Sequence, residues 1–339
     1  MRVTHVGADA QERLGGSHAC IIGVGALGCV SSDLLARAGV GTITVIDRDL
    51  VERSNLHRQP LFTESDADAK RPKALAARDR LLAGNSEIAV HAHIADFGPG
   101  NAHELINHTG TTPDVLIDGT DNFSTRYLIN DCSVKLGIPY IYGGAISTSG
   151  AAAVFTPGVG PCLRCLHPDL PQPGTQPTCQ TAGVLAPVSS IIGSYQAAEA
   201  LKVLMGQDDR VMKSMLSFDL WEGQRTRLDL TDAKDPLCPC CGLGRFDFLD
   251  AREHVPEPIC GRQAVQIHSG SKSMLDLVAL GASLNESGDF EVHDYMIRGR
   301  IEHSGEQIEL TCFADGRAII DGTDDPVLAR AVYARYIGN

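Results

Sequence analysis

A glycine-rich turn near the start of the sequence carries residues suited to nucleotide chemistry. The stretch IIGVGALGCVSSDLLARAGVGTITVID contains Gly23, Gly25 and Gly28 in a G-x-G-x-x-G pattern, and Asp47 ends it. Glycines let a backbone approach a phosphate, and the N-terminus of the next helix supplies amide donors. A carboxylate in the position of Asp47 takes the ribose hydroxyls of a nucleotide. Such a turn is found most often in oxidoreductases that bind a dinucleotide. The alternative is a strand-turn-helix that has only a structural role.

Charged and polar groups for a triphosphate follow the turn directly. The segment DRDLVERSNLHRQ provides Asp49, Asn55 and Arg58, and Lys73 lies at the start of a helical stretch, KRPKALAARD. Arg58 and Lys73 can neutralise the charge of transferring phosphates, as cationic groups do in phosphoryl chemistry. Either side chain alone would be interpreted as a solvated surface charge, so the indication comes from their combination with the turn.

Two carboxylates follow a later strand-like run. The stretch DVLIDGTDN puts Asp118 and Asp121 at the C-terminal end of that run, which is the end where open α/β sheets bind ligands. Asp121 is therefore a candidate ligand for magnesium, which prefers oxygen donors.

Two C-x-x-C pairs predict a metal site. The first pair is Cys162 and Cys165 in PCLRC, and the second is Cys238 and Cys241 in LCPCC. Four thiolates so spaced suit tetrahedral zinc, and such a site is structural because it leaves no position for water. The alternatives are disulfides or coincidentally buried cysteines, and Cys240, inside the second pair, is a secondary candidate ligand.

Cys179 differs from the other cysteines because it ends a proline-rich segment, HPDLPQPGTQPT, that no helix or central strand tolerates. We expect a loop there, shortly before a helix N-terminus, which lowers the pKa of a thiol and gives access to it. Cysteines in apolar or helical contexts are expected to serve packing. These are Cys20, Cys29, Cys132, Cys260 and Cys312.

The elements that must position these residues alternate between strand and helix, which predicts an α/β fold with a doubly wound, mostly parallel, Rossmann-like sheet. Strands are expected at 19–23, 42–47, 89–95, 114–118, 140–143, 215–220 and 226–230, and helices at 28–38, 72–83, 124–136 and 183–205. A composition break in EHVPEPICG separates a nucleotide-binding domain, 1–250, from a small α+β module, 263–339, through a linker at 251–262. The module is expected to contain a strand, a helix, three strands and a helix.

Composition and charge narrow the range of partners. The chain has 339 residues, is 43% hydrophobic, and carries 29 lysines and arginines against 42 aspartates and glutamates, a net charge of −13. This surface should repel nucleic acids and anionic membranes, so small molecules or proteins are the expected partners. No targeting pattern or long apolar run is found, and we expect a cytoplasmic protein.

Five motifs in order, GVGALG, DRDLVERSNLHRQ, RPK, DGTDN and the two C-x-x-C pairs, resemble the ThiF/MoeB/HesA adenylyltransferases over roughly Val6 to Gly242. These enzymes are similar to the adenylation domain of ubiquitin-activating enzymes. The resemblance implies ATP, Mg²⁺ and Zn²⁺ as cofactors, Arg58, Lys73 and Asp121 as catalytic residues, and Asp121 as the magnesium ligand. The implied nucleotide-binding set is Gly23, Gly25, Ala26, Gly28, Asp47, Asp49, Ser54, Asn55, Arg58, Gln59, Lys73, Asp121 and Asn122. Ala26 stands where the family usually has a glycine, and should be tolerated if its φ is negative.

The reaction that the resemblance implies is adenylation of the C-terminal glycine carboxylate of a ubiquitin-like carrier ending in Gly-Gly, in some members followed by a covalent link, here through Cys179. The carrier would be a sulfur carrier or a conjugated modifier. Past residue 260 the one cysteine is Cys312, so no rhodanese domain is expected. The end module would dock the carrier or contact a second subunit.

One departure from the resembled family lies at the N-terminus. Members usually begin with an arginine-bearing helix that reaches the nucleotide of the other subunit of a homodimer, and here Arg2 or Arg13 would have to substitute. A catalytically impaired, dimerising scaffold subunit is therefore an alternative. A third interpretation, an NAD-dependent oxidoreductase, is disfavoured because the chain has no Y-x-x-x-K pair. That interpretation also leaves the phosphate-binding cations and the two cysteine pairs without a role.

Overall fold

The computed structural model of the chain describes residues 6–170, 182–251, 264–267, 275–285, 287–303 and 306–338. The chain forms two compact units, Met1–Arg252 and Glu253–Asn339, each with its own hydrophobic core. Apart from residue 251, the expected linker lies outside the described residues. None of the described helices is long and apolar enough to cross a membrane.

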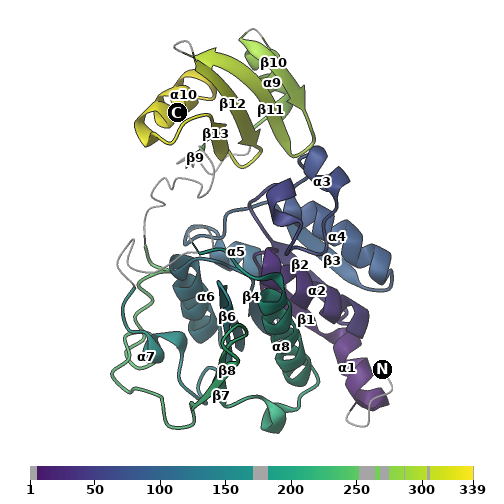
Figure 1. Ribbon diagram of the computed structural model, residues 1–339, viewed down its shortest axis with the longest axis vertical. Helices are drawn as coiled ribbons and strands as arrows, with labels where there is room; N and C mark the ends of the chain where they lie inside the picture. The colour runs from purple at the N-terminus through teal and green to yellow at the C-terminus, as the bar shows by residue number, and fades with distance from the viewer. Residues whose placement is uncertain are drawn as a thin grey trace. The chain divides into compact units, whose positions relative to one another are not determined.

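The first unit is built on one eight-stranded sheet with the strand order β3-β2-β1-β4-β5-β6-β7-β8 (Figure 1). The pairs from β3 to β5 are parallel and the pairs from β5 to β8 are antiparallel, which confirms the doubly wound, mostly parallel prediction. The strands are β1 (His18–Ile22), β2 (Thr42–Ile46), β3 (Ala89–His93), β4 (Val115–Asp118), β5 (Tyr140–Ile146), β6 (Ser149–Phe155), β7 (Ser214–Asp219) and β8 (Gln224–Asp229).

Helices pack on both faces of this sheet (Figure 1). One face carries α1 (Ala8–Gly16), α2 (Ala26–Ala38), α3 (Glu64–Asp68), α4 (Lys73–Gly84) and α8 (Ala186–Leu204), and the other carries α5 (Ala102–Ile106), α6 (Phe123–Leu136) and α7 (Leu163–Leu166). Short 3-10 turns, η1 (Arg53–Asn55) and η2 (Asp208–Arg210), complete the unit. A Cβ on Gly193 of α8 would lie 2.7 Å from Val30 Cβ, so this glycine lets α8 pack closely on α2.

The second unit is a five-stranded antiparallel sheet with the order β10-β11-β12-β13-β9. Its elements are β9 (Ala264–Ile267), α9 (Leu277–Leu284), β10 (Gly288–Val292), β11 (Met296–His303), β12 (Glu306–Phe313), β13 (Ala318–Asp321) and α10 (Pro326–Tyr336). Four strands lie between the two helices, so the expectation of three was wrong. Strand β10, with the sequence GDFEV, was missed because Phe290 is its one buried residue, so the strand has no alternating pattern of buried apolar residues.

Candidate active site

The glycine-rich turn joins the end of β1 to the start of α2. Gly23 has a φ of +88°, a conformation that side chains rarely adopt, and Gly25 is the N-cap of α2. A Cβ on Gly28 would lie 2.0 Å from the carbonyl oxygen of Gly23, and a Cβ on Gly119 would lie 1.9 Å from the same atom. The DGTDN loop therefore packs directly against the turn. Ala26 opens α2 and is not among the described non-glycine residues with positive φ, as its tolerance requires.

Asp47 lies at the base of this turn and is 8% exposed. Its Oδ2 accepts a hydrogen bond from the Val24 N–H at 2.7 Å, and its Oδ1 accepts one from the Asp49 N–H at 2.8 Å. Burial raises the pKa of this carboxyl, although the nearby Lys73 ammonium opposes the effect. Asp47 thus braces the turn, and its contact with a ribose stays a prediction.

Lys73 is the first residue of α4 and is only 6% exposed. Its Nζ donates to Asp49 Oδ2 at 2.8 Å, and its backbone N–H donates to the Asp49 carbonyl at 2.9 Å. Burial alone would lower the pKa of this ammonium, but the carboxylates of Asp49 and Asp47 outweigh burial and raise it. Lys73 is therefore a fixed cation beside the turn.

Asp121 and Asn122 end the DGTDN loop at the start of α6. Asp121 is exposed, and its carboxylate is close enough to help raise the pKa of Lys73. Asn122 caps α6 because its Oδ1 accepts the Thr125 N–H at 2.8 Å. The fold thus brings Asp47, Asp49, Lys73 and Asp121 together at the carboxyl ends of the strands.

The remaining predicted phosphate ligands lie on and after η1. Arg58 Nη2 donates to Asn55 Oδ1 at 2.8 Å, so the arginine is bonded to its own segment, while Ser54 is exposed. Gln59 is 4% exposed, and its Oε1 has no hydrogen-bond partner among the described residues. Its Nε2 lies 3.9 Å from where a Cβ of Gly25 would be, so Gln59 lies against the turn.

A buried polar network behind the site escaped the sequence analysis. Asp118 is completely buried and accepts a hydrogen bond from the Tyr140 hydroxyl at 2.8 Å, and Arg126 Nε lies 3.3 Å from its Oδ2. Arg126 also donates to the carbonyl of Thr120 at 2.9 Å, which fixes the loop that presents Asp121. A carboxylate at the end of an apolar strand was the available signal, because such a group needs a buried partner.

Arg13 does not reach this site within its own chain. Its Nη1 donates to the Met205 carbonyl at 3.4 Å, at the C-terminal end of α8. Arg2, the other candidate, lies outside the described residues, as do Cys179 and Cys260. The cysteines predicted to serve packing that the structure does describe, Cys20, Cys29, Cys132 and Cys312, are all buried.

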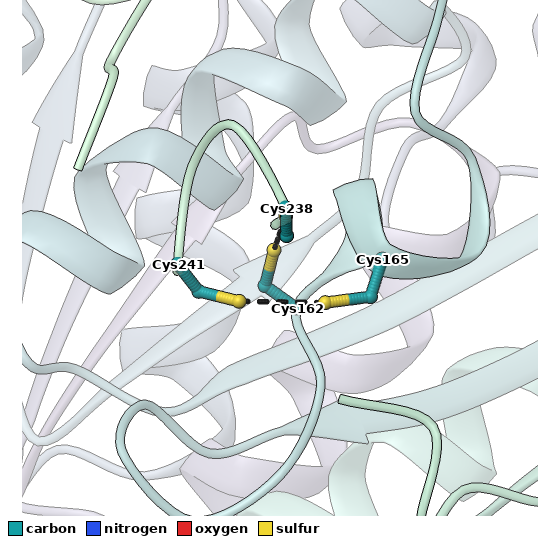
Figure 2. A group of neighbouring side chains, drawn as sticks. All are labelled: Cys162, Cys165, Cys238 and Cys241. Atoms are coloured by element: carbon teal, nitrogen blue, oxygen red, sulfur yellow. Dashed lines mark hydrogen bonds between the residues drawn. The ribbon is translucent and has the colours of Figure 1, made fainter. Parts of the chain in front are cut away.

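The two C-x-x-C pairs meet in space, as Figure 2 shows. The Sγ atoms of Cys162, Cys165, Cys238 and Cys241 all lie within 4.8 Å of one another, at 3.6 Å for Cys162 to Cys238 and 3.4 Å for Cys165 to Cys241. In a tetrahedral zinc–thiolate site, a zinc–sulfur bond of about 2.3 Å places the sulfurs about 3.8 Å apart. The donor set therefore fits a four-coordinate thiophilic metal.

Hydrogen bonds already shape the charge of this cluster. A hydrogen bond from the Cys240 thiol is the main cause that lowers the pKa of Cys162, and the backbone amide of Cys165 adds to it. Burial raises the pKa of Cys238, while the backbone amides of Cys240 and Cys241 oppose that rise. Burial also raises the pKa of Cys241, so it is at Cys162 that hydrogen bonds favour the thiolate, the form that binds a metal.

The sequence of the chain is similar to those of known proteins. The sequence profile of the ThiF family matches residues 1–240. A protein named sulfur carrier protein ThiS adenylyltransferase, from Bacillus subtilis, is 38% identical over 335 residues, and the match covers 98% of this chain and 96% of that protein. A sulfur carrier protein adenylyltransferase from Thermus thermophilus is 40% identical, covering 77% of this chain and 94% of its own.

Solved structures share the fold. The crystal structure of E. coli MccB with succinimide has a TM-score of 0.59 and 23% sequence identity, and the match covers 69% of this chain and 68% of that one. The fold likeness at this level of identity concerns the arrangement of elements alone.

Proposed function

The chain belongs to the ThiF family, and we propose that it catalyses the ATP-dependent adenylation of the C-terminal glycine carboxylate of a ubiquitin-like sulfur carrier. A carboxylate oxygen bonds to the α-phosphorus of ATP, the bond from that phosphorus to the bridging oxygen breaks, and pyrophosphate leaves. Because a carboxylate is anionic at neutral pH, the step needs no general base. The products are a carrier acyl-adenylate and pyrophosphate.

The observation that carries this proposal is the buried Lys73, whose ammonium is held by Asp49 and lies close to Asp47 beside the glycine turn. A cation fixed in place costs little reorganisation when charge develops on the α-phosphate and on the leaving pyrophosphate. We assign the same neutralising role to Arg58, which exchanges its bond to Asn55 for the phosphates when ATP binds. Catalysis by these groups consists of alignment and charge neutralisation.

Two metals belong to the proposal. Magnesium would be held by Asp121, whose exposed carboxylate is near enough to Lys73 to help raise its pKa, and it would supply neutralising charge for the triphosphate. Zinc would be held by Cys162, Cys165, Cys238 and Cys241 and would serve structure, because four thiolates fill its coordination sphere.

The kind of carrier follows from the extent of the similarity. The Bacillus subtilis relative matches both units of the chain, and its name specifies ThiS as the carrier that it adenylates. We therefore propose a carrier of the ThiS kind over a conjugated modifier, although a relative from Haloferax volcanii, 36% identical over 250 residues, is named SAMP-activating enzyme E1. We further propose a homodimer in which Arg2 or Arg13 of one subunit would reach the nucleotide of the other.

ATP–pyrophosphate exchange by the purified chain tests the reaction. Exchange should require both MgATP and a carrier that ends in Gly-Gly, and should vanish with a carrier that lacks the terminal glycine. Mass spectrometry of the same mixture should detect the carrier adenylate, and would detect a covalent adduct at Cys179. A dimer that exchanges no pyrophosphate with any carrier would instead favour the scaffold subunit.

A further inference from the structure

The two cysteine pairs lie on two segments outside the strands of the sheet, so no ladder of backbone hydrogen bonds holds these segments together. Cys162 is the N-cap of the four-residue helix α7, and Cys238 and Cys241 lie in a stretch without helix or strand. Helix α6 brings two adjacent, buried polar residues to these segments. Asn130 is 1% exposed and Asp131 is completely buried.

Asn130 bonds both cysteine segments at once. Its Oδ1 accepts the backbone N–H of Leu163 at 2.8 Å, directly after Cys162, and its Nδ2 donates to the Sγ of Cys240 at 3.3 Å, inside the second pair. A side-chain amide can accept and donate at the same time, whereas a carboxylate only accepts. An asparagine at this buried position of α6 can therefore bond both segments.

Cys240, between the two cysteines of the second pair, is the residue of that segment that Asn130 contacts. It is completely buried and packs in one cluster with Cys162 and Cys238, yet its sulfur is not part of the group of four that lie within 4.8 Å of one another. Cys240 therefore supports the four sulfurs from outside the tetrahedron.

Asp131 adds a second tie from the same helix. Its Oδ2 accepts the backbone N–H groups of Phe248 at 2.9 Å and Leu249 at 3.4 Å. Arg164 Nη2, on α7, donates to Asp247 Oδ2 at 3.1 Å, so the first cysteine segment is also joined to the chain that follows the second pair. The two segments are thus held together by side chains, independently of any ion.

We propose that Asn130 is the positioning residue of the cysteine metal centre, and that Cys240 is a contact to the ligands and not itself a ligand. This inference rests on the proposed zinc site and not on the adenylation reaction. Residues behind metal ligands typically contribute about 10- to 100-fold to metal affinity, and we expect an effect of that size for Asn130.

The test compares variants of the full chain by zinc release to a chromophoric chelator and by the sulfur-to-metal absorption of the cobalt-loaded protein. Asn130→Leu should release zinc about 10 to 100 times faster than the wild type. Asn130→Asp, which keeps the acceptor for Leu163 but loses the donor to Cys240, should be intermediate. Cys240→Ala should keep the four-thiolate cobalt spectrum.

Ser133→Ala is the matched control. Ser133 lies on the same helix, is 1% exposed and donates to the Ile138 carbonyl at 2.6 Å, but among the described residues it forms no hydrogen bond to a cysteine segment. It should release zinc at the wild-type rate even if its thermal stability falls.

Three results would overturn the proposal. They are zinc release from both Asn130 variants no faster than from Ser133→Ala, a Cys240→Ala spectrum that lacks the contribution of one thiolate, and a wild-type chain that binds neither zinc nor cobalt. The last result would remove the metal site as well, while pyrophosphate exchange separately decides the adenylation.

Discussion

Lys73 and Asp49 are joined twice, through a 2.8 Å ion pair between their side chains and a 2.9 Å hydrogen bond between their backbones. The double connection fixes the start of α4 to the segment after β2, so the lysine is held before any nucleotide binds. A cation held in this way stabilises a transition state because folding has already fixed its orientation, so it need not reorganise during the reaction.

Lys73→Ala should therefore lower pyrophosphate exchange by about 10²- to 10³-fold, which is typical for the loss of one fixed group that stabilises developing charge. Arg78→Ala, on the exposed side of the same helix, removes a surface ion pair with Asp79 and should leave exchange unchanged. Near-normal exchange by Lys73→Ala, with a circular dichroism spectrum like that of the wild type, would refute the assignment.

The metal content of the purified protein gives a second prediction. Inductively coupled plasma mass spectrometry should find about one zinc per chain, because the four cysteines offer one tetrahedral site. Cys165→Ser and Cys241→Ser should each lose most of the zinc and melt at a lower temperature. Cys132→Ala removes a buried cysteine of α6 outside the cluster, and its protein should keep its zinc.

The buried network at Asp118 predicts a stability effect without a direct loss of catalytic groups. Tyr140→Phe deletes the hydroxyl that donates to the Asp118 carboxylate at 2.8 Å and should cost about 1.5 to 3 kcal/mol of unfolding free energy, as bonds to charged groups do. Arg126→Met removes the cation beside a completely buried carboxylate and should cost about 3 to 5 kcal/mol. Denaturant unfolding followed by fluorescence measures both, and a larger effect for Tyr140→Phe would contradict the ion-pair argument.

Much of the fold was predictable because parallel strands buried on both faces leave strong apolar runs. The predicted strands at β1, β2 and β4 agree with the structure to within one residue, and α2 and α6 begin close to the expected positions. The strand β6 was missed because SGAAAVF is rich in alanine and glycine, which have low strand propensity, and only its neighbours in the sheet define it. Short helices such as α5 and α7 lack the length for a visible period.

The residues of the site also divide into those that the sequence predicted and those that it did not. Glycines, acids and cysteines in short motifs were visible because their chemistry depends on spacing along the chain. The partners Arg126 and Tyr140 of Asp118, and Asn130 with Cys240, were not visible because each pair is joined by a tertiary contact between different elements.

Four histidines at the margin of the first sheet predict a pH dependence of stability. The ring centroids of His93 and His108 are 4.2 Å apart, and those of His91 and His108 are 4.8 Å apart. The Nε2 atom of His18 hydrogen bonds the Thr44 hydroxyl. Burial, followed by repulsion from the ring of His108, lowers the pKa of His18 and of His93 to about 4. Asp114 opposes this at His18 but does not reverse it.

A histidine with a lowered pKa in the folded state binds protons more tightly when the chain is unfolded. Its contribution to stability is therefore complete above the unfolded pKa of about 6.5 and is lost as the pH falls from there toward 4. The melting temperature should fall between pH 7 and pH 5, and His93→Gln, which removes one proton site, should make that fall smaller. His103→Gln, on the exposed side of α5, should leave the fall unchanged, and an equal effect of both variants would contradict the role of the cluster.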